Sequence, residues 1–329
     1  MIDTIYIEEG IEEFSKSREV ISRFPKATVI PCKHYKEIFN PSAQSFRLQK
    51  KRPALILARQ TGKLVHPIPP TYGVGGKHNF YFSHLLNCLY DCRYCFLQGM
   101  YPSAHYLMFV NFDDFKQEIT KVANSSTDPS WFFSGYDCDS LALESVTGFA
   151  GHFLPFFSTL PNAWLELRTK SVNTQVLQKL DPLPRAVVAF SFTPDEVSTQ
   201  VEHGVPSVKS RIQAMHRLAG LGWKLGLRID PLLDCKDFEK RYWQLFKDIF
   251  AEVPEHAIHS ISVGAFRMPS SFYKKIEKQY QDEPLFAGNF ATQKKYISYL
   301  PDKEYRLKQT CLHLLEKWVD PKKVFTCET

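Results

Sequence analysis

The sequence predicts an α/β protein: an incomplete (β/α)6 TIM-like barrel with an N-terminal extension and a helical C-terminal tail. About six apolar, strand-like segments alternate with single helical segments from residue 78 onward, and this alternation is typical of βα units in a parallel sheet. The 329 residues, 44% of them hydrophobic, are enough to bury such a core. We expect an extension over 1–75, a partial barrel over 76–266, and a C-terminal region over 267–329 that packs on the barrel.

The extension has its own local pattern. It opens with a strand-like TIYI from residue 4, and a helical stretch follows from Glu12 to Arg23. A basic run at 47–52 then precedes the apolar strand ALILA at 54–58. Prolines 67, 69 and 70 mark the end of this segment, since proline interrupts regular structure.

The barrel strands and helices follow in order. The expected strands are NFYFSHLLN (79–87), SWFFSG (130–135), AWLELRTKS (163–171), RAVVAFSF (185–192), WKLGLRIDPLL (223–233) and HSISVGAF (259–266). Helices are expected at 112–123, 141–159, 173–179, 207–222 and 237–251, and the 207–222 segment has the apolar rhythm of a helix with a terminal glycine. The tail contains KKIEKQY and a further helix near 303–318.

Composition and charge limit the class of protein and its cellular compartment. Charged residues make up 23% of the chain and the formal net charge is +6, which argues against wholesale disorder and permits an acidic partner without requiring one. The acidic N-terminus lacks the pattern of a signal peptide, and no apolar run reaches the about 18 residues of a membrane span. The eight cysteines are too sparse for a disulfide framework. We expect a cytoplasmic protein.

Three cysteines carry the chemical signal. Cys88, Cys92 and Cys95 have the spacing Cys-x3-Cys-x2-Cys directly after a predicted strand. Thiolates ligate iron–sulfur clusters, and three of them leave one iron of a [4Fe–4S] cluster open. That iron could chelate the amino and carboxylate groups of S-adenosyl-L-methionine, whose reductive cleavage releases a 5′-deoxyadenosyl radical. The cofactor would supply the chemistry and the protein its position.

Zinc is the alternative ligand for these thiols. His84 or His105 could complete a closed tetrahedral site, and the chain would then be a zinc-stabilised nucleic-acid-binding module without catalysis. Against this, structural zinc sites usually pair two Cys-x2-Cys knuckles, and the sequence has one. An aromatic residue, Tyr94, also stands directly before the last cysteine.

The motif CxxxCx-aromatic-C at the end of a first barrel strand resembles the radical S-adenosylmethionine superfamily. The ordered segments NCLYDCRYCFLQG, FVNFDDF, DSLALESVTG, FSFTPDEV, VEHGVPSVKSRIQA and SVGAFR resemble the spore photoproduct lyase family from about 78 to 270. The resemblance implies an iron–sulfur, metal-binding radical lyase of DNA repair that abstracts hydrogen from a thymine lesion. A flavodoxin- or ferredoxin-like protein would be its electron donor.

The resemblance also implies roles for individual residues. The cluster ligands would be Cys88, Cys92 and Cys95. Ser134 and Gly135, in the turn SGYD, occupy the place of the turn that holds the cofactor's amino group. Lys170 matches the lysine that binds the cofactor's carboxylate, and Ser191 a cofactor-binding serine. From the residues alone, Lys170 is equally a solvated charge and Ser191 an ordinary strand hydroxyl.

The sequence departs from the family at the residues that handle hydrogen. In the family a cysteine returns a hydrogen to the product radical and two tyrosines relay hydrogen back to the cofactor. Tyr94 matches the first tyrosine, but the second is Phe96, which has no O–H to donate. An ungapped match places Tyr136 at the donor cysteine and Cys138 two residues further on. Either residue could be the donor, or Cys138 could be a packing residue, and the chemistry could instead act on a peptide or small metabolite.

Basic and aromatic patches indicate a nucleic-acid partner. The run Lys50-Lys51-Arg52, the stretch from Arg267 to Tyr280 and the pair Lys322-Lys323 could contact phosphates. Aromatic side chains in the tail could stack on bases, namely Phe266, Phe272 and Tyr273. The alternative for each patch is a solvated face over an aromatic core.

Overall fold

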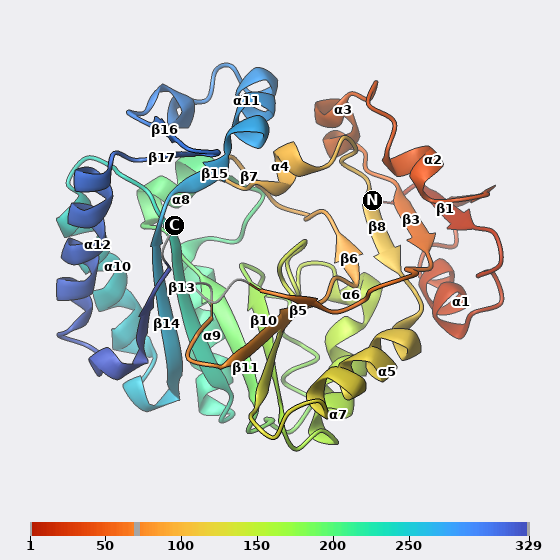
Figure 1. The fold of residues 1–329 in the computed structure, drawn as a ribbon, viewed down its shortest axis with the longest axis horizontal. Helices are drawn as coiled ribbons and strands as arrows, with labels where there is room; N and C mark the ends of the chain where they lie inside the picture. The colour runs from red at the N-terminus through yellow and green to blue at the C-terminus, as the bar shows by residue number, and fades with distance from the viewer. Residues whose placement is uncertain (1, 69–72, 328–329) are drawn as a thin grey trace.

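The core of the molecule is a curled, mostly parallel sheet. In the computed structural model, which describes residues 2–68 and 73–327, this sheet contains eight strands in the order β18-β14-β13-β11-β10-β9-β5-β4 (Figure 1). The six central strands are parallel and confirm the predicted incomplete barrel. They are β5 (His78–Tyr81), β9 (Ser130–Phe133), β10 (Ala163–Thr169), β11 (Ala186–Ser191), β13 (Lys224–Leu232) and β14 (Ile258–Ala265).

Helices cover the outer side of this sheet. They include α5 (Phe112–Ala123), α9 (Val208–Gly220) and α10 (Phe238–Glu252). The short helix α8 (Asp195–Val201) lies instead at the carboxyl ends of the strands, next to β12 (Glu202–His203). The helix predicted over 141–159 is two helices, α6 (Glu144–Thr147) and α7 (Phe149–Ser158), because Gly148 between them has a left-handed φ of 58°.

The helix predicted over 173–179 is wrong. This short connection between β10 and β11 forms turns. The carbonyl of Leu177 accepts a hydrogen bond from the Trp223 indole N–H at 3.0 Å instead of from a following helical turn. Pro182 and Pro184 then leave little chain in which a helix could continue. The buried Leu177 side chain makes this connection part of the core.

The N-terminal extension builds another sheet, in the order β2-β1-β3-β8-β6. Its strands are β1 (Thr4–Glu8), β2 (Thr28–Cys32), β3 (Leu55–Ala58), β8 (Tyr106–Phe109) and β6 (Leu85–Leu86). The last two flank the cysteine loop in sequence, so the extension and that loop share one sheet. Helices α1 (Ser15–Ser22) and α3 (Phe46–Lys51) belong to this side of the molecule (Figure 1). The domain boundary at 75 stays a prediction, and Pro69 and Pro70 lie outside the described residues.

The C-terminal region is only partly helical. A small antiparallel sheet of β15 (Arg267–Pro269), β17 (Tyr296–Ser298) and β16 (Ala291–Gln293) accompanies helices α11 (Ser270–Gln279) and α12 (Pro301–Leu315). Two short strands complete the edges of the barrel sheet: β4 (His66–Pro67) on β5, and β18 (Val324–Thr326) on β14. Within the described part of the chain, no helix combines the length and apolarity that crossing a membrane requires.

A buried ion pair joins two barrel strands. Arg228 on β13 donates from Nε to one carboxylate oxygen of Glu166 on β10 at 3.0 Å and from Nη2 to the other at 2.6 Å. Both side chains are fully buried. Burial opposes the charge of Glu166, but Arg228 outweighs it and holds the pKa of that carboxyl below its usual value. Removing one partner would leave the other charge unpaired in the core.

We predict that Arg228→Met lowers the free energy of unfolding by about 3–5 kcal/mol, because it leaves Glu166 buried without a counter-ion. Urea-induced unfolding measures this change. Arg52→Met, which breaks the exposed pair with Asp3, is the control and should cost less than about 1 kcal/mol. Equal losses for the two variants would contradict the assignment of the buried pair as a core contact.

Candidate active site

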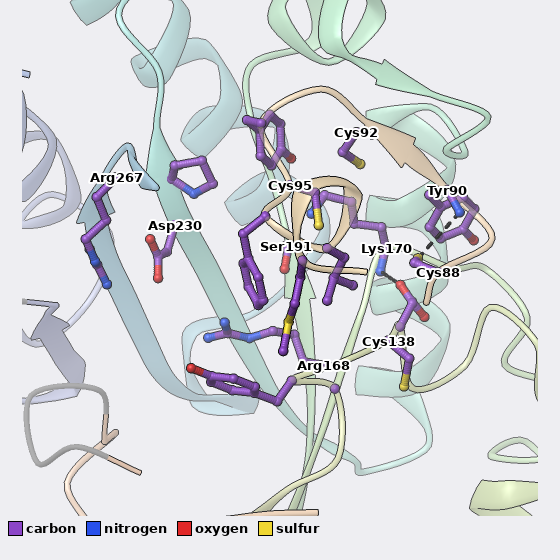
Figure 2. Close-up of a pocket in the computed structure, with 18 of the residues that line it drawn as sticks. Cys88, Tyr90, Cys92, Cys95, Cys138, Arg168, Lys170, Ser191, Asp230 and Arg267 are labelled. Carbon is purple, nitrogen blue, oxygen red and sulfur yellow. Dashed lines mark hydrogen bonds between the residues drawn. The ribbon is translucent and has the colours of Figure 1, made fainter. Parts of the chain in front are cut away.

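A cavity of about 410 Å³ opens at the carboxyl ends of the barrel strands, where barrel active sites lie. Strand ends supply Gly135 after β9, Lys170 after β10, Ser191 on β11 and Phe266 after β14. The cysteine loop closes another side of the cavity and contributes Cys88, Cys92, Tyr94 and Cys95. Figure 2 shows the three cysteines grouped around the Lys170 side chain.

Side chains from distant elements hold the cysteine loop. It begins at Asn87, whose φ of 71° is left-handed and whose amide donates to the carbonyls of Ser103 (2.8 Å) and His105 (2.7 Å). Its middle, β7 (Asp91–Cys92), pairs antiparallel with β12 (Glu202–His203). Gln98 in α4 (Leu97–Met100) donates to the carbonyl of Cys92 at 2.6 Å.

The C-terminal region holds the other side of the loop. The Tyr280 hydroxyl lies within hydrogen-bond distance of Gln98 Oε1 at 2.7 Å and of Asp91 Oδ1 at 3.1 Å. The guanidinium of Arg93 lies 3.8 Å from the centre of the Tyr280 ring and pairs with Glu283 at 3.2 Å. The loop is therefore held by the barrel region on one side and by the C-terminal region on the other.

The three thiols fit an iron–sulfur cluster. Burial raises the pKa of Cys88 to about 12, and it also raises the pKa values of Cys92 and Cys95. Three bare thiolates are therefore costly in this cavity, and coordinated iron would offset that cost. Among the residues that the structure describes, no three His, Cys, Asp or Glu side chains converge as ligands of a single metal ion. The three cysteines nevertheless line the same cavity.

Neither histidine of the zinc alternative lies in the cavity wall. The His84 ring is buried and stacks on Phe149 with the ring centres 3.7 Å apart. His105 accepts a hydrogen bond from the backbone N–H of Ala54 at 3.0 Å. The structure therefore gives the zinc site no fourth ligand from either of them.

The predicted cofactor-binding residues are brought together with one exception. Lys170 and Ser191 line the cavity, and so does Gly135, at which an added Cβ would lie 2.8 Å from the carbonyl oxygen of Arg168. Ser134 does not reach the cavity. Its hydroxyl is buried behind the turn and bonds the Ser140 hydroxyl at 2.9 Å and the carbonyl of Glu166 at 3.0 Å.

Lys170 remains a cation in this setting. Burial disfavours its charge, but the neighbouring Cys92 and Glu202 outweigh burial and raise the pKa of the ammonium. Asp139, which the sequence analysis missed, fixes the backbone here by accepting hydrogen bonds from the N–H of Lys170 and the hydroxyl of Thr169, both at 2.6 Å. Lys170 is thus held as a positive group beside the cysteines.

Tyr94 ends in a buried ionic network. Its hydroxyl donates to Glu202, which also accepts from Ser198 at 2.7 Å and from Arg211 at 2.7 Å. Burial alone would raise the pKa of Glu202, but Arg211 and Lys170 together lower it. The segment VEHGVPSVKSRIQA contains both Glu202 and Arg211, and only the fold reveals that they pair.

Both candidate hydrogen donors line the cavity. Cys138 is 6% exposed, and its thiol points to the carbonyl of Ser134 at 3.6 Å. Tyr136 is 40% exposed and stacks on Tyr81 with the ring centres 4.5 Å apart. Its ring lies 6.0 Å from that of Phe96.

The opposite wall is polar, and the sequence analysis named only Arg267 of its residues, as part of a stretch that could contact phosphates. Asp230 and Arg267 lie across the cavity from the cysteine loop, with Arg168 between them and Cys138 (Figure 2). Cys327 also lines the cavity. These residues come from β10, β13, β15 and the end of the described chain, so no local sequence signal groups them.

Several residues of the predicted nucleic-acid patches make contacts within the protein. Lys50 donates to two carbonyls of the cysteine loop, and Lys323 pairs with Glu255. Phe266 and Tyr273 are buried and pack against Phe290. Phe266 and Phe272 both line the cavity, and Phe272 is the less buried of the two.

Comparisons with known proteins agree with this geometry. A family model described as spore photoproduct lyase matches residues 79–319. The chain is similar to the spore photoproduct lyase of Geobacillus sp. (strain Y412MC61), with 26% identity over 49% of this chain and 48% of the relative. It is also similar to that of Bacillus subtilis (strain 168), with 24% identity over 71% of this chain and 70% of the relative. It thus spans about half the length of the first relative.

Solved structures show the same fold. A spore photoproduct lyase complexed with dinucleoside spore photoproduct matches with a TM-score of 0.84 and 17% identity over 100% of this chain and 98% of that one. A mutant spore photoproduct lyase with bound AdoMet and dinucleoside spore photoproduct matches with a TM-score of 0.85 and 16% identity, over 100% of this chain and 98% of that chain. Streptococcus suis SuiB bound to precursor peptide SuiA matches with a TM-score of 0.51 and 12% identity, over 77% of this chain and 49% of that chain.

Burial raises the pKa of the Cys138 thiol well above its ordinary value. We therefore predict that its alkylation by iodoacetamide in metal-free protein keeps rising with pH beyond 9, because the thiolate forms late. A peptide spanning residues 134–142 is the control, and its rate should level off near the ordinary cysteine pKa of about 8.5. Mass spectrometry of the modified peptide measures both rates, and equal profiles would contradict the prediction.

Proposed function

Because the chain belongs to the spore photoproduct lyase family, whose model matches residues 79–319, we propose that it is a radical S-adenosylmethionine lyase that repairs a thymine lesion in DNA. This proposal rests on one observation: Cys88, Cys92, Cys95, the cationic Lys170 and the buried Cys138 thiol all line the same cavity. Solved relatives with bound AdoMet and dinucleoside spore photoproduct support the substrate. Family membership disfavours the peptide or small-metabolite alternative.

The cofactors would occupy the cysteine side of the cavity. Cys88, Cys92 and Cys95 would hold a [4Fe–4S] cluster, which supplies the electron that cleaves S-adenosylmethionine into methionine and a 5′-deoxyadenosyl radical. Lys170 would pair with the cofactor's carboxylate, and Ser191 would position it at the end of β11. Leu97, Met100 and Phe272 give this cavity apolar walls, which help to keep water from a radical.

Cys138 is the hydrogen donor that we favour. Once a hydrogen atom has left the lesion and its methylene bridge has broken, the product radical needs one hydrogen atom. The buried Cys138 S–H can give that atom and become a thiyl radical. It suits this role because it is held protonated in the cavity wall, whereas Tyr136 is 40% exposed.

The thiyl radical must then recover a hydrogen. The Tyr94 O–H is the source that we propose, and the tyrosyl radical would in turn take a hydrogen from 5′-deoxyadenosine. Phe96 has no hydroxyl, but Tyr136 lies against its ring and brings a phenol to the same part of the cavity. Tyr136 would thus serve as a relay and not as the first donor.

The electron donor and compartment follow from the cofactor. We propose a flavodoxin- or ferredoxin-like protein as the source of the electron. A reducing, cytoplasmic setting suits the eight free cysteines and an oxygen-sensitive cluster.

Anaerobically reconstituted protein should absorb broadly in the visible range and, with dithionite, convert S-adenosylmethionine to 5′-deoxyadenosine. Cys92→Ala should abolish this product because the cluster loses a ligand. Chromatography of the quenched reaction measures it, and Cys235→Ala, outside the cavity, is the matched control. A colourless protein with stoichiometric zinc would refute the proposal.

Cys138→Ala should separate radical formation from repair. We expect 5′-deoxyadenosine still to form from S-adenosylmethionine, while conversion of dinucleoside spore photoproduct to thymine falls to the level of Cys92→Ala, because the product radical lacks its donor. Tyr136→Phe should form thymine from the first turnover but sustain fewer turnovers. The reverse pattern, with Tyr136→Phe blocking the first turnover, would assign the donor role to Tyr136.

A further inference from the structure

A lysine of the N-terminal extension reaches the cysteine loop. Lys50, at the end of α3, donates from its ammonium to the carbonyl of Cys88 at 2.6 Å and to that of Tyr90 at 2.9 Å. These carbonyls belong to the irregular stretch between β6 and β7. Buried carbonyls without a partner are costly, so Lys50 satisfies a need that no strand or helix meets.

The neighbouring residue strengthens the same attachment. Gln49 accepts hydrogen bonds from the N–H of Ala104 at 2.9 Å and from the hydroxyl of Ser103 at 3.3 Å. Asn87 binds the carbonyl of Ser103 from the other side. One short helix thus contacts both the start of the cysteine loop and the chain that returns from it, which fixes the distance between α3 and Cys88.

The charge of Lys50 matters as much as its hydrogen bonds. An ammonium bound to the Cys88 carbonyl stands beside the first cluster ligand. Reduction adds a negative charge to a thiolate-bound cluster, and a nearby cation stabilises the reduced form more than the oxidised form. Net charge and hydrogen bonding near the ligands are known to set cluster potentials.

We infer that Lys50 is a positioning residue of the cluster: it holds the Cys88 end of the loop and raises the reduction potential of the iron–sulfur centre. This inference rests on the cluster that the proposed function requires. It also explains why the extension is joined to the loop, and it replaces the predicted phosphate contact for this lysine.

The test compares three variants of the full chain, reconstituted anaerobically without substrate. Lys50→Met removes the charge and both hydrogen bonds, Lys50→Arg keeps a charged donor, and Lys51→Met makes the same charge change on the next, exposed residue. We expect Lys50→Met to shift the cluster potential to a more negative value in a mediated redox titration. We also expect iron retention against a chelator to fall by about tenfold or more. Lys50→Arg and Lys51→Met should stay near the parent values.

Hydrogen exchange in the metal-free protein gives a second readout. The amides of residues 88–95 should lose protection in Lys50→Met and keep it in Lys51→Met. If Lys50→Met does not fold, the same cluster potential, iron retention and hydrogen exchange are measured on Lys50→Gln instead.

The inference would be overturned if Lys50→Met and Lys51→Met had the same cluster reduction potential and the same iron retention. So would a Lys50→Arg variant that behaves like Lys50→Met, because the effect would then not come from charge. Weaker DNA binding with an unchanged potential would assign Lys50 to phosphate contact instead. Failure of the proposed function is distinct from all of these, since the parent chain itself would then bind no cluster or form no 5′-deoxyadenosine.

Discussion

The structure depends on keeping three cysteines at fixed positions in a loop that has little regular backbone bonding of its own. A helix or strand would fix its residues through its own hydrogen bonds, but this loop borrows partners from elsewhere. Asn87 and Gln98 provide local bonds, Glu202 lies in the strand that pairs with β7, and Lys50 and Tyr280 reach in from opposite ends of the chain. The extension and the tail are therefore structural parts of the active site.

Electrostatics follow from the same arrangement. The thiols, Glu202 and the Tyr94 hydroxyl form a negative or electron-rich layer, and three cations face it: Lys50, Lys170 and Arg211. Arg211 pairs with Glu202, the Lys170 ammonium lies 5.4 Å from the centre of the Tyr94 ring, and Lys50 binds two carbonyls of the cysteine loop. These cations lie around the cysteine loop, while Asp230 and Arg267 line the far side of the cavity (Figure 2).

Much of the fold and of the candidate site could be predicted from the sequence, because strand periodicity and cysteine spacing are local signals. The six central strands needed only the order of segments. The rule that strand ends meet placed Cys88, Cys92 and Cys95 near Lys170 and Ser191, but it was the family resemblance that singled out these last two residues. The break at Gly148 and the missing helix at 173–179 depended on a backbone conformation and on a tertiary hydrogen bond from Trp223. Arg267 and Cys327 could not be assigned to the cavity, because the partners that place them are distant in sequence. For the same reason, Lys50 was predicted as part of a basic run that could contact phosphates.

The cavity wall also has a consequence for biosynthesis. Its described residues extend from Ile68, through the cysteine loop that Lys50 anchors, to Cys327, which follows the edge strand β18. While the ribosome still holds the segment that forms β18, the cavity lacks that wall and the loop waits in a partly folded chain. The cavity wall is therefore complete only after that segment has been translated.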